Sequence, residues 1–89
     1  MIFRVHAVQR MLQRSITVEE VRLVLEHGEI VEDYPEDTPY PSQLLLHWVH
    51  ERPLHVVAAY NAALDESIVI SVYQPDLSKW NPDFKGRRS

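Results

Sequence analysis

The spacing of apolar residues predicts two helices in the first part of the chain. Between His6 and about Gln13, apolar residues recur with the 3.6-residue period of a helix. Thr17, followed three residues later by Glu20, has the sequence of a capping box and indicates a second helix. Gly28 is expected to end that helix, because glycine adopts positive φ readily. The residues predicted to form the apolar sides are Ala7, Val8, Met11, Leu12, Val18, Val21, Val24 and Leu25.

The chain beyond Gly28 has the pattern of strands. β-branched and aromatic residues become frequent there, and proline begins to recur. A short edge strand is expected over residues 29–34, followed by a stiff loop over 35–42. Three more strands are expected over 43–49, 54–60 and 67–73, with connections short enough for antiparallel hairpins. The predicted class is α+β, with two N-terminal helices packed on one face of a twisted three- to four-stranded antiparallel β-sheet.

Strand alternation divides the three longer strands into two faces. The apolar face, which the helices are expected to cover, consists of Leu44, Leu46, Trp48, Leu54, Val56, Ala58, Tyr60, Ile68, Ile70 and Val72. The mixed face consists of Leu45, His47, Val49, His55, Val57, Ala59, Val69, Ser71 and Tyr73. A functional site is expected on the mixed face, since its polar groups gather there. The alternative is that these groups are ordinary half-exposed sheet residues.

The composition is that of one globular domain. A chain of 89 residues is expected to form a single domain over residues 1–89. The absence of cysteine excludes disulfide scaffolds, cysteine-ligated zinc and thiol catalysis. The first ten residues carry charge where a signal peptide needs an apolar core, and no apolar run approaches the roughly 20 residues of a membrane span. We therefore expect a cytoplasmic protein without a membrane partner.

The distribution of charge is uneven. The net charge of −4 argues against a protein whose whole surface binds nucleic acid. Residues 1–16 contain three arginines and no acid, and residues 74–89 are also basic, whereas residues 17–42 contain eight acids and one arginine. If the fold brings the two ends together, a basic site would lie on an acidic body. The alternative is ordinary solvated charge.

The first candidate for chemistry is a cationic ridge formed by His6, Arg10 and Arg14. These residues are spaced four apart, so they project from one flank of the first predicted helix. Guanidinium groups hold phosphate or carboxylate, and histidine exchanges protons near neutral pH. The alternative is a solvated helix face whose arginines pair with acids such as Glu20 or Glu29.

The second candidate combines Arg52, in a predicted turn, with His55 in the strand that follows. A cation and an imidazole in this order suit charge stabilisation and proton transfer on an anionic substrate. In the alternative interpretation, Pro53 only shapes the turn. His47 and His50 are expected to diverge, and the chain has no H-E-x-x-H motif, so neither a metal nor another cofactor is expected.

The third candidate is the end of the chain. Trp80 and Phe84 have the spacing to cap an open edge of the core. The alternative is that these aromatic residues, which lie between basic residues, stack on unpaired bases.

Several separated motifs then occur in a characteristic order. They are H-A-x-x-R-M-x-x-R-S-I-T-x-E-E-V, Y-P-x-D-x-P-Y-P-S, R-P-L-H-V-V, V-Y-x-P-D and a late tryptophan. With these motifs the chain resembles, from about His6 to Arg88, a family of small bacterial proteins known as domain of unknown function 4258. Family members often have glycine where this chain has Ser15. The family name implies no established activity.

More distantly, two helices followed by an antiparallel sheet are similar to the RelE-type toxin fold. Many members of that fold are metal-independent ribonucleases of toxin–antitoxin pairs, which implies RNA as substrate and an antitoxin or other small protein as partner. The roles this resemblance implies are proton transfer by His55 and His6, phosphate binding by Arg10, Arg14 and Arg52, and an orienting or acidic hydroxyl on Tyr73. The alternative function is a non-catalytic interaction module, either a homodimer or the partner of another small protein. Binding of a small ligand or of a metal ion is a further alternative.

Overall fold

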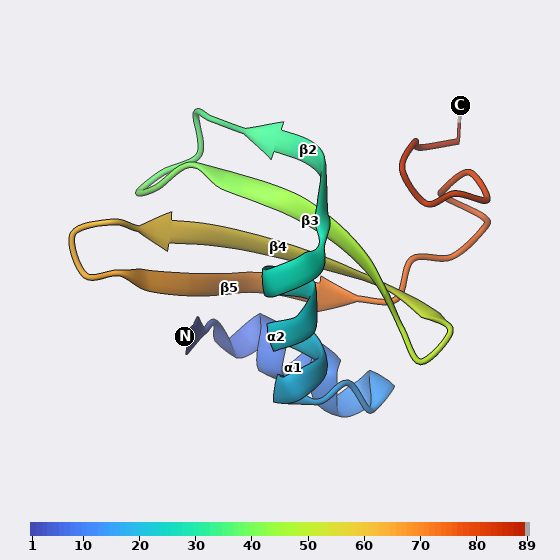
Figure 1. Cartoon of the computed structure of the whole chain (residues 1–89). Helices are drawn as coiled ribbons and strands as arrows, with labels where there is room; N and C mark the ends of the chain where they lie inside the picture. Colours follow the sequence, from blue (N-terminus) through green and yellow to red (C-terminus); the bar gives the residue numbers. More distant parts are fainter. Residues whose placement is uncertain (89) are drawn as a thin grey trace.

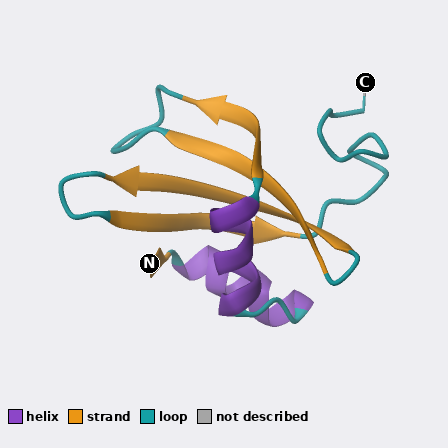
Figure 2. Cartoon of the chain, in the orientation of Figure 1, coloured by secondary structure: helices purple, strands orange, loops and turns teal. Residues whose placement is uncertain are grey.

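The computed structural model describes residues 1–88 and has an α+β fold with two helices and a five-stranded mixed sheet (Figure 1). Figure 2 shows both helices on one side of the sheet. The strand order in the sheet is β1-β5-β4-β3-β2. The elements, in chain order, are β1 (Ile2–Phe3), α1 (Val5–Arg14), α2 (Val18–His27), β2 (Glu29–Tyr34), β3 (Ser42–Val49), β4 (Arg52–Asn61) and β5 (Glu66–Tyr73). None of the helices within residues 1–88 is long and apolar enough to span a membrane.

The capping box predicted at the start of α2 is confirmed. The Thr17 hydroxyl accepts a hydrogen bond from the Glu20 amide (3.1 Å), and the Glu20 carboxylate accepts one from the Thr17 amide (2.9 Å). A cap of this kind stabilises a helix by about 1 kcal/mol. The start of α2 is therefore fixed by local sequence.

Gly28 ends α2, but the prediction of a positive φ there was wrong, since φ is −67°. Glycine is needed here because the backbones of α2 and β3 come too close to this position to leave room for a side chain. A Cβ atom at this position would clash with the carbonyl oxygen of Val24 and would lie 3.2 Å from that of Leu46. Glycine thus allows the chain to pass directly from α2 into β2, next to β3.

The left-handed residue at the end of a helix is instead Ser15, which follows α1 with φ 53° and ψ 44°. Such a conformation costs a non-glycine residue about 1–2 kcal/mol, and glycine loses about 0.5–1 kcal/mol more backbone entropy on folding. We therefore expect Ser15→Gly to raise the free energy of unfolding by about 0.5–1 kcal/mol in urea denaturation. Ser78→Gly, in an exposed turn whose serine hydroxyl and amide contact Asp76, is the control and should not stabilise the protein. Equal effects of the two substitutions would contradict the prediction.

The four strands β2 to β5 form the predicted antiparallel meander. The sheet differs from the prediction in having a fifth strand, β1, which pairs in parallel with β5. A strand of two residues is too short to show a period of alternation, which is why sequence analysis missed it. β1 lies at the edge of the sheet, and the chain passes from it directly into α1.

The prediction of which residues share a face was wrong for β3. Leu45 lies opposite Val56 in the register, so it faces the helices, whereas Leu44 and Leu46 face the other side. A shift of one residue exchanges the two faces of a strand. A bulge after Val57 likewise moves Val69 to the helix side. His47, opposite Leu54, also lies on the helix side, with its ring centroid 5.8 Å from that of His27.

Two apolar clusters hold the sheet, one on each face. The cluster under the helices consists of Ala7, Met11, Ile16, Val21, Val24, Leu45, Val49, Leu54, Val56, Val69 and Val72. The cluster on the opposite face consists of Leu44, Leu46, Trp80 and Phe84. Trp80 and Phe84 belong to residues 74–88, which we call the C-terminal segment. Figure 1 shows this segment beyond the end of β5, in orange to red. Trp80 and Phe84 therefore cover a face of the sheet rather than an edge of the core.

The predicted apolar side of α1 is only partly buried. Ala7 and Met11 contact the core, but Val8 is 40% exposed and Leu12 is 78% exposed. Val18, predicted to be buried by α2, is 48% exposed. The apolar surface of the helices is thus wider than the part that the sheet covers.

Candidate functional site

A cleft of about 310 Å³, lined mainly by polar and charged residues, lies between α1, the end of β5 and the C-terminal segment. We call it the polar cleft. Helix α1 contributes the cationic ridge of His6, Arg10 and Arg14, and β5 contributes Ser71 and Tyr73. The residues from the C-terminal segment are Gln74, Pro75, Asp76, Lys79, Trp80 and Arg87. The cationic ridge of α1 and basic residues near the end of the chain thus lie around the same cleft.

The charge of the polar cleft is opposite to that of the whole chain. Arg10, Arg14 and Lys79 give three positive charges against the single carboxylate of Asp76, an excess of two in a chain of net charge −4, while the charge of Arg87 is balanced by Glu32. Hydrogen bonds from Ser78 lower the pKa of Asp76, so this carboxyl is ionised at neutral pH. Within residues 1–88, Arg10, Arg14 and Lys79 form no ion pair. Their charges are available to an anionic ligand.

Arg87, by contrast, is held by the protein. Its Nη2 lies 3.0 Å from Oε1 of Glu32, and its Cζ lies 4.6 Å from the centre of the Trp80 ring. The hydrogen bonds from Arg87 and Tyr34 lower the pKa of Glu32. Because Arg87 covers the ring of Trp80, which is only 3% exposed, that ring is not free to stack on a base. Trp80 therefore forms part of the wall of the polar cleft.

Tyr73 connects the polar cleft to a buried histidine. His55 and Tyr73 are cross-strand partners in β4 and β5, and Nδ1 of His55 lies 3.2 Å from the Tyr73 hydroxyl. His55 itself is fully buried, packed edge-on against Trp80 with ring centroids 4.5 Å apart. The predicted pair of His55 and Tyr73 on one face is thus present, but only Tyr73 lines the cleft.

The hydrogen bonds of His55 define its tautomer. Nε2 lies 2.8 Å from the carbonyl oxygen of Phe84, which only accepts, so Nε2 carries the hydrogen and donates it. Burial lowers the pKa of His55 from its ordinary value of 6.5, so the ring is neutral at pH 7 and Nδ1 accepts from the Tyr73 hydroxyl. The oxygen of Tyr73 then keeps its lone pairs for a ligand, and burial raises the pKa of this phenol.

The carbonyl that holds His55 is positioned by a turn of the C-terminal segment. Phe84 adopts a left-handed φ of 58°, and its amide donates to the carbonyl of Asn81 (2.8 Å). The Asn81 amide in turn donates to the carbonyl of Gly86 (2.8 Å). The buried ring of Phe84 anchors this turn against the sheet. A backbone carbonyl in an irregular segment leaves no signal in the sequence, so this contact could not be predicted.

Arg52 does not line the polar cleft. Its guanidinium forms an ion pair with Glu20 (2.9 Å) and donates to the backbone carbonyls of Arg14 (3.0 Å) and Ser15 (3.4 Å). Burial tends to raise the pKa of Glu20, but hydrogen bonds from the Thr17 amide and Arg52 hold it below 4.5. Arg52 thus ties the start of β4 to the junction between α1 and α2. We assign it this structural role instead of the predicted contact with substrate.

A metal centre has no support in the described part of the chain. Residues 1–88 contain no group of three or more histidine, cysteine, aspartate or glutamate side chains arranged to hold a metal ion. Of the basic residues that line the polar cleft, Lys79 and Arg87 were not among the predicted proton-transfer or phosphate-binding residues. In the sequence they stand out only as basic residues next to the aromatic residues of the chain end.

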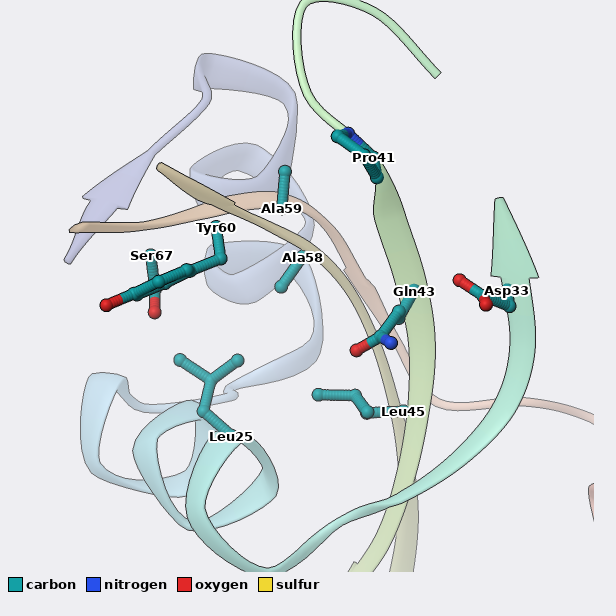
Figure 3. Close-up of a pocket in the computed structure, with 9 residues that line it drawn as sticks. All are labelled: Leu25, Asp33, Pro41, Gln43, Leu45, Ala58, Ala59, Tyr60 and Ser67. Carbon is teal, nitrogen blue, oxygen red and sulfur yellow. The ribbon is translucent and has the colours of Figure 1, made fainter. Parts of the chain in front are cut away.

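A second hollow, of about 340 Å³, lies on the helix side of the sheet, where α2 leaves it uncovered (Figure 3). Figure 3 shows Leu25, Leu45 and Ala58 around its apolar part, with Asp33 as its single charged group. The Tyr60 hydroxyl there is bound to Asp65. Since no basic side chain lines this hollow, the polar cleft is the better candidate for an anionic ligand.

A model of the family described as "Domain of unknown function (DUF4258)" matches residues 3–74. The chain belongs to this family. The matched residues contain the cationic ridge, His55 and Tyr73, while the residues that the C-terminal segment adds to the polar cleft follow almost entirely after them. No curated protein and no solved structure matches the chain significantly. The similarity to RelE-type toxins therefore stays a prediction.

Proposed function

We propose that the protein is a metal-independent ribonuclease that cleaves RNA phosphodiesters in the polar cleft. One observation carries this proposal: the cationic ridge and Tyr73, with His55 behind it, line the same cleft. The cleft thus combines groups that bind a phosphate with groups that move a proton. As in RelE-type toxins, the protein would act in the cytoplasm, and an antitoxin or other small protein would restrain it.

Arg10, Arg14 and Lys79 are proposed to hold the phosphate. Their unpaired charges suit the negative charge that grows on the phosphoryl oxygens in the transition state. The acidic surface elsewhere weakens non-specific binding of RNA, so a substrate is attracted only where the cleft focuses positive potential. An acidic net charge is consistent with this arrangement, provided that binding is confined to the cleft.

The 2′-hydroxyl of the nucleotide is proposed to attack the adjacent phosphorus. Its proton passes to the oxygen of Tyr73 while the Tyr73 proton passes to Nδ1 of His55. A proton from the His6 imidazole passes to the 5′-oxygen as the bond from that oxygen to phosphorus breaks. The products are a 2′,3′-cyclic phosphate and a 5′-hydroxyl, and exchange with water restores the two histidines. In this scheme His55 acts through Tyr73 and never touches the substrate.

The test is cleavage of a short single-stranded RNA in the presence of EDTA. We expect cleavage with a cyclic phosphate product, and none of the same oligonucleotide carrying 2′-deoxyribose throughout. Arg10→Ala and Arg14→Ala should each lower kcat/KM by about tenfold, which corresponds to about 1.4 kcal/mol of transition-state binding.

Arg22→Ala is the matched control, because Arg22 is an exposed arginine of α2 that pairs with Glu19. It should cleave like the unmodified protein. Equal activity in all these preparations would come from a contaminating nuclease and would contradict the proposal. Cleavage that requires a divalent metal ion would also contradict it.

A further inference from the structure

The exposed side of α1 carries an apolar stripe that the protein itself does not cover. Val5, Val8 and Leu12 are spaced three and four apart, so they form one line along the helix. They are 73%, 40% and 78% exposed. Contiguous apolar surface of this kind is a mark of protein association.

A hollow lies beside the stripe, where α1 meets α2. It has a volume of about 340 Å³ and is lined by Phe3, Val8, Met11, Leu12, Ile16, Thr17 and Val18. The surface therefore presents both a protruding side chain, Leu12, and a recess next to it. A patch that carries both a projection and a recess offers a second copy of itself a place for each, as an interface with twofold symmetry requires.

The charges around this surface favour a second copy over other occupants. Gln9 and Gln13 separate the stripe from the cationic ridge, and on the α2 side Glu19 and Arg22 neutralise each other (3.3 Å). A neutral rim offers no specific contact to a strongly charged partner or to an anionic membrane. It also avoids the repulsion that like charges would cause between two identical surfaces.

We propose that the protein forms a symmetric dimer in which α1 packs antiparallel to α1 of a second copy. Leu12 of each copy enters the recess of the other beside Val8. The stripe and the cationic ridge lie on roughly opposite sides of α1, so the polar cleft of each copy stays open. The dimer is therefore independent of the proposed ribonuclease activity.

The first test is the mass of the full chain by sedimentation equilibrium between about 1 µM and about 1 mM. We expect a dimer that dissociates on dilution, and Leu12→Glu should raise its dissociation constant at least tenfold. Leu64→Glu is the matched control, since Leu64 is 72% exposed in the turn between β4 and β5. A monomer at all concentrations, or an equal effect of the control, would overturn the proposal.

The second test uses the expected contact between Leu12 and Val8 of the other copy. Leu12→Glu and Val8→Lys should each weaken the dimer, but an equimolar mixture should recover it. In the mixed dimer one contact pairs glutamate with lysine, and the other keeps the original leucine and valine. Recovery supports the antiparallel arrangement, and failure of the mixture to associate better than the separate variants contradicts it. Both tests measure only association, so they are decided separately from RNA cleavage.

Discussion

Replacing Tyr73 by phenylalanine should reduce RNA cleavage by about 100-fold or more, the usual contribution of a positioned proton-transfer group. The substitution removes the hydroxyl that links the polar cleft to His55 but keeps the ring that packs beside it. If Arg10 and Arg14 hold the phosphate as proposed, the loss should appear in kcat with little change in KM, because the substitution leaves both arginines in place. Steady-state cleavage of an RNA oligonucleotide in EDTA measures both parameters.

The matched control is Tyr60→Phe. It likewise removes one phenol hydroxyl that is hydrogen-bonded to another side chain, here the carboxylate of Asp65. Tyr60 lies in β4, away from the residues that line the polar cleft. Equal losses in the two variants, or a loss of Tyr73→Phe that appears only in KM, would contradict the proton relay. His55→Ala is a poorer test, because deleting a fully buried ring leaves a cavity that lowers stability as well.

Trp80→Ala should lower the free energy of unfolding by about 3–5 kcal/mol, the range for a large aromatic residue deleted from a core. Trp80 is 3% exposed, packs against the His55 ring in a T-shaped arrangement and belongs to the cluster with Leu44 and Leu46. Its loss would leave the open face of the sheet without its main cover. Urea denaturation followed by circular dichroism measures the change.

Trp48→Ala provides the comparison for this second result. Trp48 is 51% exposed and meets Phe84 from outside the cluster, with ring centroids 5.6 Å apart. Its removal should cost about 1 kcal/mol, as is typical for a partly exposed side chain. A smaller effect at position 80 than at position 48 would show that the C-terminal segment does not contribute to the stability of the sheet.

Local sequence determined much of the fold. The capping box at Thr17 located α2, and the alternation of apolar runs with short turns gave the meander from β2 to β5. The faces of β3 were less predictable. Leu44, Leu45 and Leu46 are all apolar, so no alternation of apolar and polar residues shows which of them face the helices. Only the pairing of Leu45 with Val56 decides this.

The same limit applies to the candidate site. The spacing of His6, Arg10 and Arg14 predicts their common side of α1, because helical geometry is local. The role of Arg52 was missed because its partner, Glu20, lies 32 residues away in the sequence. Pairing between such distant residues depends on how the elements pack, which no periodic pattern records.

The contribution of the C-terminal segment to the polar cleft affects when the site can form during synthesis. Lys79 and Arg87 line the cleft, and Phe84 holds the ring behind Tyr73. Domains fold as the chain emerges from the ribosome, with earlier segments appearing first. A growing chain in which only the helices and the sheet have emerged therefore has no complete cleft. If the protein cleaves RNA, the messenger and ribosome that produce it are not exposed to an active enzyme until residues 79–87 have left the exit tunnel.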